Sequence, residues 1–155
     1  MKDIKAGEQL FCCYTSQSVS AQDRQKRLAR HGIVCECPAC ANATPESDRL
    51  RQEFPQRIQY FGMLSDEWVR HPANCLSEKL LEPVFELKEA MEKECLDSGI
   101  GFISLLIVLY KVYMKMGLPV KAEEYGAKVD KLLGLPNGKL RPSVDIWNFG
   151  DDSTG

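Results

Sequence analysis

The sequence predicts a mainly α fold, in which a helical C-terminal domain follows a small N-terminal element that combines a β-strand with a cysteine-rich segment. Three observations support this prediction. Apolar residues recur at steps of three and four through most of residues 45–135, which is the period of amphipathic helices. Residues 8–14 form the one convincing strand pattern, and three cysteines fall within residues 35–40.

The composition is that of a globular protein that can bury a core. Of the 155 residues, 44% are hydrophobic and 27% are charged, which suits one ordinary domain or two small units. A net charge of −2 provides no basic field for nucleic acid or anionic lipid, so neither is expected as a direct partner. The longest apolar run, residues 100–114, is broken by Lys111 and is too short to span a bilayer. Because the first residues also lack the apolar core of a signal peptide, we expect a nuclear or cytoplasmic protein without a membrane partner.

Residues 1–15 are predicted to contain a turn and one strand. The turn lies at Ala6–Gly7, and an alternating pattern marks a strand from about Glu8 to Tyr14. A lone strand pair is not stable in water, and no second strand pattern follows. We therefore expect the sequence to begin inside a fold whose first part precedes Met1.

Residues 16–44 are predicted to form a short helix followed by the cysteine-rich segment. Ser20 is a suitable N-cap for the helix, and Gly32 is a suitable residue for its C-terminal end. Cys35, Cys37 and Cys40 follow with the spacing C-x-C-x2-C. Disulfides are disfavoured in a reducing compartment, so clustered cysteines there are more typical of metal ligands.

The spacing of these three cysteines indicates a zinc site. Zinc prefers four ligands in a structural site and binds thiolate sulfur at about 2.3 Å. Cys37 and Cys40 can hold one ion across a tight turn, and Cys35 reaches the same ion if the backbone curls. A metal-free thiol cluster is the alternative, whereas a redox pair is disfavoured because the motif does not link a strand to a helix. The candidates for a fourth ligand are His31, Cys12, Cys13, His71 and Cys75.

Residues 45–135 are predicted to be helical, and residues 136–155 form an irregular tail. One apolar stripe runs from Leu50 to Trp68, with a kink or break expected at Pro55. A second stripe consists of Leu80, Val84, Leu87, Met91 and Cys95. The nearly continuous apolar segment over residues 101–117 predicts a helix that is buried on most sides. Cys75 and Cys95 are expected to be small buried residues.

The last two predicted helices resemble a tetratricopeptide unit. The residues that carry this resemblance are Tyr110, Tyr113, Gly117, Ala122, Tyr125, Gly126 and Ala127. Small residues in the second helix allow a neighbouring helix to approach closely. One unit is not an array, so a plain helical hairpin fits the pattern equally well, and a concave peptide-binding surface would require stacked repeats.

Two segments taken together resemble the end of a SET domain and the post-SET segment that follows it. In that family of lysine methyltransferases, a Gly-Glu-x-Leu strand leads to a tyrosine, and an Arg-x-x-x-Leu helix then runs into Gly-Phe-x-Cys-x-Cys-x2-Cys. The matching residues here are Gly7, Glu8, Leu10, Tyr14, Arg24, Leu28, Gly32, Ile33, Cys35, Cys37 and Cys40. The helical remainder resembles, more loosely, the C-terminal region of fungal and SET-and-MYND-type members.

The resemblance implies a methyltransferase that uses S-adenosylmethionine to modify lysine side chains of a protein such as a histone. Tyr14 would be the catalytic residue, because its phenol would line the lysine channel and orient the amine toward the methyl group. Ile33 stands where the family has an aromatic residue facing the cofactor or the lysine channel, which assigns Ile33 to the cofactor site. The three cysteines would hold structural zinc, with the family's fourth ligand supplied from the segment before Met1.

Other parts of the family's cofactor site do not occur in the sequence. The family has a Gly-x-Gly and an Asn-His-x-x-x-Pro-Asn-like segment upstream of the tyrosine, and neither occurs before Tyr14. The expectation is therefore a fragment of a lysine methyltransferase that is inactive as an isolated chain. The alternative hypothesis, from a different class, is a non-enzymatic, zinc-stabilised helical module for protein interactions.

Overall fold

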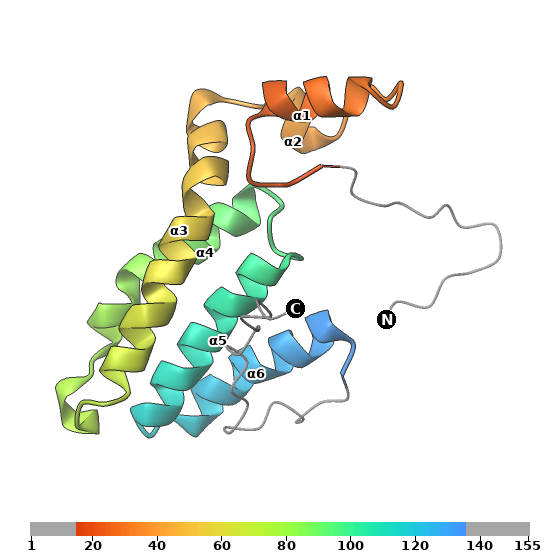
Figure 1. Ribbon diagram of the computed structural model, residues 1–155. Coiled ribbons are helices and arrows are strands. Elements are labelled where there is room, and N and C mark those ends of the chain that lie inside the picture. The colour runs from red at the N-terminus through yellow and green to blue at the C-terminus, as the bar shows by residue number, and fades with distance from the viewer. Residues whose placement is uncertain (1–14, 136–155) are drawn as a thin grey trace, which may run out of the picture.

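The computed structural model describes residues 15–135, which form a bundle of helices with a small helical unit at one end (Figure 1). No strand occurs between residues 15 and 135, so the predicted mainly α class is confirmed. In chain order the elements are α1 (Ala21–Ala29), α2 (Pro38–Ala41), α3 (Pro45–Trp68), the 3-10 turns η1 (Ala73–Cys75) and η2 (Glu78–Leu81), α4 (Glu82–Lys93), α5 (Ile100–Lys115) and α6 (Pro119–Leu133). The predicted strand over residues 8–14 and the tail over residues 136–155 lie outside the described residues.

The hydrophobic core is centred on α5. This helix contacts α3, α4 and α6, and Figure 1 shows it between α3 and α6. Its predicted burial is confirmed, since the buried residues are Phe102, Ile103, Leu105, Leu106, Ile107, Val108, Leu109, Val112 and Tyr113. Because these side chains point in several directions around the helix, three neighbours are needed to remove them from water. Even so, neither α5 nor any other helix within residues 15–135 has the length and apolarity that a membrane crossing requires.

Helix α3 is continuous, so of the kink or break expected at Pro55, the break does not occur. Its start is fixed by a capping box in which the Thr44 hydroxyl accepts a hydrogen bond from the Ser47 N–H at 3.1 Å, and the Ser47 hydroxyl accepts one from the Thr44 N–H at 3.1 Å. A proline within a helix removes one hydrogen bond of the ladder. Phe54, beside Pro55, is buried in the core, so packing holds the helix together at this point.

The apolar stripe predicted for α4 is shifted at both ends. The buried residues of this region are Leu81, Val84, Leu87, Met91 and Leu96. Leu80 and Cys95, which were predicted in the stripe, are exposed. The α-helix begins only at Glu82, after a 3-10 turn with a tighter period, and Cys95 has a left-handed φ of 56° that ends it. Cys75 is also exposed, so the burial predicted for both lone cysteines is wrong.

Helices α5 and α6 form a hairpin joined by a tight turn. Gly117 in this turn has a φ of 73°, which is a left-handed conformation that glycine adopts without steric cost. Helix α6 begins at Pro119 and ends before Gly134, as predicted. A Cβ atom at Gly126 would lie 3.3 Å from the Tyr110 ring. The small residue in α6 therefore permits the close approach of the two helices.

Candidate metal centre

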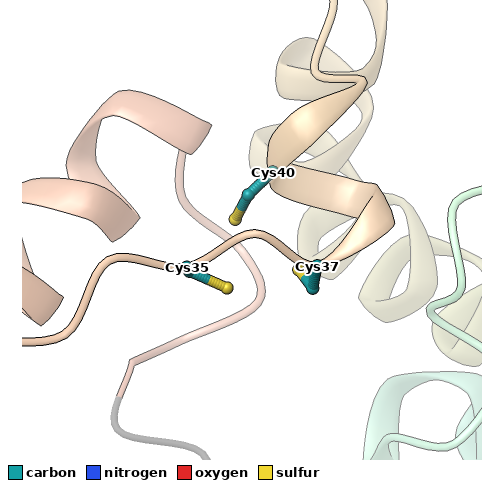
Figure 2. Close-up of side chains that lie close together, drawn as sticks. All are labelled: Cys35, Cys37 and Cys40. Carbon is teal, nitrogen blue, oxygen red and sulfur yellow. The ribbon is translucent and has the colours of Figure 1, made fainter.

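Cys35, Cys37 and Cys40 form a cysteine cluster next to α1 (Figure 2). Cys35 lies in the extended segment before α2, Cys37 is the N-cap of α2, and Cys40 lies within that helix. Their Sγ atoms all lie within 4.8 Å of one another, and Figure 2 shows the side chains of Cys35 and Cys40 directed toward each other. The predicted convergence of the three thiols is confirmed, and the cluster could hold a metal ion.

The short helix α2 brings Cys37 and Cys40 together. Cys37 is in an extended conformation, and Pro38 follows at the first helical position, where its fixed φ and missing N–H are tolerated. The N–H groups of Cys40 and Ala41 donate to the Cys37 carbonyl at 2.8 and 2.9 Å. Residues three apart in a helical turn lie on one side of it, so the C-x2-C spacing places both thiols on the face toward Cys35.

The thiols of the cluster differ in acidity. Burial raises the pKa of Cys37, but hydrogen bonds from the Cys35 thiol and from the backbone at Cys40 and Ala39 outweigh burial, so this pKa is lowered. A hydrogen bond from the Cys37 backbone lowers the pKa of Cys35, but its contacts with the other two thiols and its burial together raise it. Because the thiolate is the metal-binding form, the lowered pKa of Cys37 favours metal binding by this thiol.

Helix α1 contacts the cluster through hydrogen bonds to its backbone. The Gln25 amide donates to the Cys35 carbonyl at 2.6 Å and accepts from the Cys35 N–H at 3.1 Å. Arg24 donates to the carbonyls of Val19 and Ala39 at 2.6 and 3.0 Å. Neither the cysteine spacing nor the apolar pattern points to Gln25, and Arg24 is marked only by the family motif. Hydrophobic periodicity carries no signal for a polar side chain that bonds a distant backbone.

Within residues 15–135 the cluster contains three ligands and no fourth. His71 and Cys75 lie beyond the C-terminal end of α3, whose 24 residues make it about 36 Å long. His31 is nearer in sequence, but it does not join the cluster. The remaining candidates, Cys12 and Cys13, lie outside the described residues.

The structure describes one of the two residues that the SET resemblance assigns to catalysis and cofactor binding. Tyr14 lies outside the described residues. Ile33 is half-buried, and its N–H donates to the Leu28 carbonyl at 3.1 Å, just after Gly32 with its φ of 68°. This hydrogen bond closes the C-terminal end of α1. It involves only the backbone of Ile33, so the place of the Ile33 side chain in a cofactor site stays a prediction.

No protein-family model, curated protein or solved structure matches the chain. Support for a function therefore comes from the cysteine cluster and the helices around it. The resemblance of residues 7–40 to the SET family is likewise a proposal.

Proposed function

We propose that the cysteine cluster is a structural zinc site. The observation that carries this proposal is the convergence of three Sγ atoms within 4.8 Å of one another. Zn–S bonds of about 2.3 Å in a tetrahedral site place the sulfur atoms about 3.8 Å apart, so the thiols need to approach by no more than about 1 Å. Soft thiolate ligands favour zinc over hard cations such as magnesium or calcium.

A structural role fits both the ligands and their surroundings. Sulfur-only ligand sets are typical of structural zinc sites, whereas catalytic sites usually contain histidine or carboxylate and keep a position open for water. Helix α1 has nine residues and α2 has four, lengths at which isolated helices are marginal in water. An ion held by Cys35, Cys37 and Cys40 would link the extended segment to α2 and stabilise this small unit.

The zinc proposal is tested by metal analysis of the purified chain after dialysis without chelator. We expect about one zinc per chain, and we expect this zinc to be lost when Cys35, Cys37 and Cys40 are all replaced by serine. The matched control replaces Cys75 and Cys95 by serine, because both are exposed and lie outside the cluster. Zinc-free protein with thiols that titrate freely would rule the site out.

We further infer that residues 1–44 are the end of a SET domain and its post-SET segment, and that α3 to α6 belong to the helical C-terminal domain of such a protein. In support, the Ser20-capped helix, the turn at Gly32 and the cysteine cluster follow one another in the order of the family motif. The α5–α6 hairpin, with Gly126 against Tyr110, is compatible with a tetratricopeptide-like unit. The preceding part of the protein would supply the fourth zinc ligand and the S-adenosylmethionine site.

This second proposal predicts a lysine methyltransferase in full-length form and no activity in the isolated chain. The coding sequence upstream of Met1 is expected to continue in frame and to encode the Gly-x-Gly and Asn-His segments. Transfer of labelled methyl groups to histones or other proteins by the purified 155-residue chain would contradict the predicted inactivity. An upstream frame without those segments would contradict the assignment to the SET family.

The alternative function is a zinc-stabilised helical interaction module without enzymatic activity. One observation favours it: α6 exposes an apolar side chain near each of its ends, with 72% of Val120 and 47% of Leu133 accessible. Exposed apolar groups of this kind occur at protein interaction sites, although single ones are common on any surface. This alternative is preferred if the upstream sequence lacks the cofactor segments while zinc is bound as expected.

A further inference from the structure

We propose that α1 acts as a positioning element for the cysteine cluster, with Gln25 as the residue that sets its affinity for metal. The proposal rests on the zinc site proposed above. It adds the residues that hold the cysteine ligands in position. Gln25 is not itself a ligand. It would act through the backbone of Cys35, which it holds in place with both ends of its amide.

The two hydrogen bonds of Gln25 define where Cys35 lies. The side-chain NH₂ donates to the Cys35 carbonyl at 2.6 Å, and the side-chain oxygen accepts from the Cys35 N–H at 3.1 Å. Only one orientation of the amide satisfies both bonds, so its assignment follows from the network. Residues 33–36 have no regular secondary structure. The amide therefore pairs with the Cys35 N–H and carbonyl in the way that the backbone of a neighbouring strand would in a sheet.

Arg24 fixes the other half of the cluster from the adjacent position on α1. The residue is 6% exposed, and its two terminal nitrogen atoms donate to the carbonyls of Val19 at 2.6 Å and Ala39 at 3.0 Å. Ala39 lies between Cys37 and Cys40, so this bond locates the turn that carries both thiols. The guanidinium is a rigid planar group, and it therefore holds α2 at a fixed distance from the chain that precedes α1.

Together these contacts connect both parts of the cluster to one helix. Gln25 binds the residue that carries the first thiol, and Arg24 binds the turn that carries the other two. The conformational entropy of the segment is then lost on folding rather than on metal binding, which raises the affinity for metal. Residues that orient metal ligands from outside the coordination sphere typically change affinity by about 10- to 100-fold when they are mutated.

The experiment compares cobalt(II) and zinc binding by the full chain with binding by three variants. In Gln25→Ala both hydrogen bonds are lost. In Gln25→Glu the carboxylate can still accept from the Cys35 N–H but no longer donates to its carbonyl. Gln22→Ala is the matched control, because Gln22 is exposed on the same helix. Affinity is measured by chelator competition, the site geometry by the cobalt absorption spectrum, and the stability of the helical bundle by urea unfolding.

We expect at least about a 10-fold loss of metal affinity in Gln25→Ala, a smaller loss in Gln25→Glu and no change in Gln22→Ala. The cobalt spectrum of Gln25→Ala should also change, while the urea midpoint of the bundle stays the same. Unchanged affinity and spectrum in Gln25→Ala would overturn the inference. It would also be overturned if affinity fell only in proportion to a loss of overall stability. Absence of cobalt binding by the unmodified chain would instead reject the metal site itself.

Discussion

The end of α4 offers a test of backbone strain that is independent of the metal site. Within residues 15–135, four helices end with a residue of positive φ, and three of these residues are Gly32, Gly117 and Gly134. The fourth is Cys95, with a φ of 56°. Each end is closed by the same type of hydrogen bond, and in α4 the Leu96 N–H donates to the Met91 carbonyl at 2.8 Å. We predict that Cys95→Gly stabilises the protein.

The expected change in the free energy of unfolding for Cys95→Gly follows from two opposing contributions. A side chain with a Cβ atom in the left-handed conformation costs about 1–2 kcal/mol. Glycine relieves this strain, but its greater freedom in the unfolded chain costs about 0.5–1 kcal/mol. Because Cys95 is exposed, little packing is lost, and the free energy of unfolding should rise by about 0.5–1 kcal/mol. The midpoint of thermal unfolding should rise by about 1–4 °C in a chain of this size.

The assay is urea unfolding followed by far-UV circular dichroism, with two controls. Cys95→Ala keeps the Cβ atom and removes the thiol, so its stability should stay close to that of the unmodified chain. Gly117→Ala is the reverse experiment, because a Cβ atom there meets nothing within 4 Å and its cost is entirely conformational. It should lower stability by about 1 kcal/mol. If Cys95→Gly is neutral or destabilising, or if Cys95→Ala stabilises equally, the strain argument is refuted.

Three further predictions concern the bundle. Leu105→Ala should lower the free energy of unfolding by about 2–5 kcal/mol because Leu105 is fully buried in α5; urea unfolding measures this, and a loss under 1 kcal/mol would contradict it. Arg51→Met should lower the free energy of unfolding by about 1–3 kcal/mol, because buried Arg51 donates to the Glu94 carbonyl at 2.7 Å. Urea unfolding measures this too, and an unchanged free energy would mean that the contact contributes nothing to stability. Burial, followed by nearby carboxylates, raises the pKa of Tyr113. Since the folded state favours the neutral phenol, the contribution of Tyr113 to stability should be constant below about pH 10 and fall as the pH rises further. Unfolding at pH 9 and 11 checks this, because Tyr113→Phe should lose less stability between the two pH values than the unmodified chain.

Much of the helical fold could be predicted because burial leaves a periodic trace in the sequence. The apolar run of α5 and the glycine and proline residues at the ends of α6 were sufficient to place both helices. The ends of α4 were not predictable in this way. A 3-10 turn precedes Glu82, and a cysteine takes the position where Gly32, Gly117 and Gly134 end the other helices. Without a glycine, the sequence contains no local sign that the helix stops at that point.

The metal site was predictable to the extent that its ligands are close in sequence. The C-x-C-x2-C spacing alone implied that the three thiols could meet, and their Sγ atoms lie within 4.8 Å of one another. The supporting residues could not be predicted, because Gln25 bonds a residue ten positions away through a long-range contact between a side chain and the backbone. Nothing in periodicity or local propensity reports such a contact, since α1 needs Gln25 for no apolar or capping purpose.

The arrangement of α1 implies that metal binding and the stability of the bundle are largely separable. The more extensive helix-to-helix contacts of residues 15–135 lie among α3, α4, α5 and α6, and Figure 1 shows α1 and α2 together at one end of the bundle. A direct polar link from α1 to the bundle is the Ala21 N–H, which donates to the Asp48 carboxylate at 2.7 Å. Units joined by few contacts open independently of one another. Loss of metal should therefore leave the core around α5 folded. For this reason metal affinity and urea stability can be measured as separate quantities in the Gln25 variants.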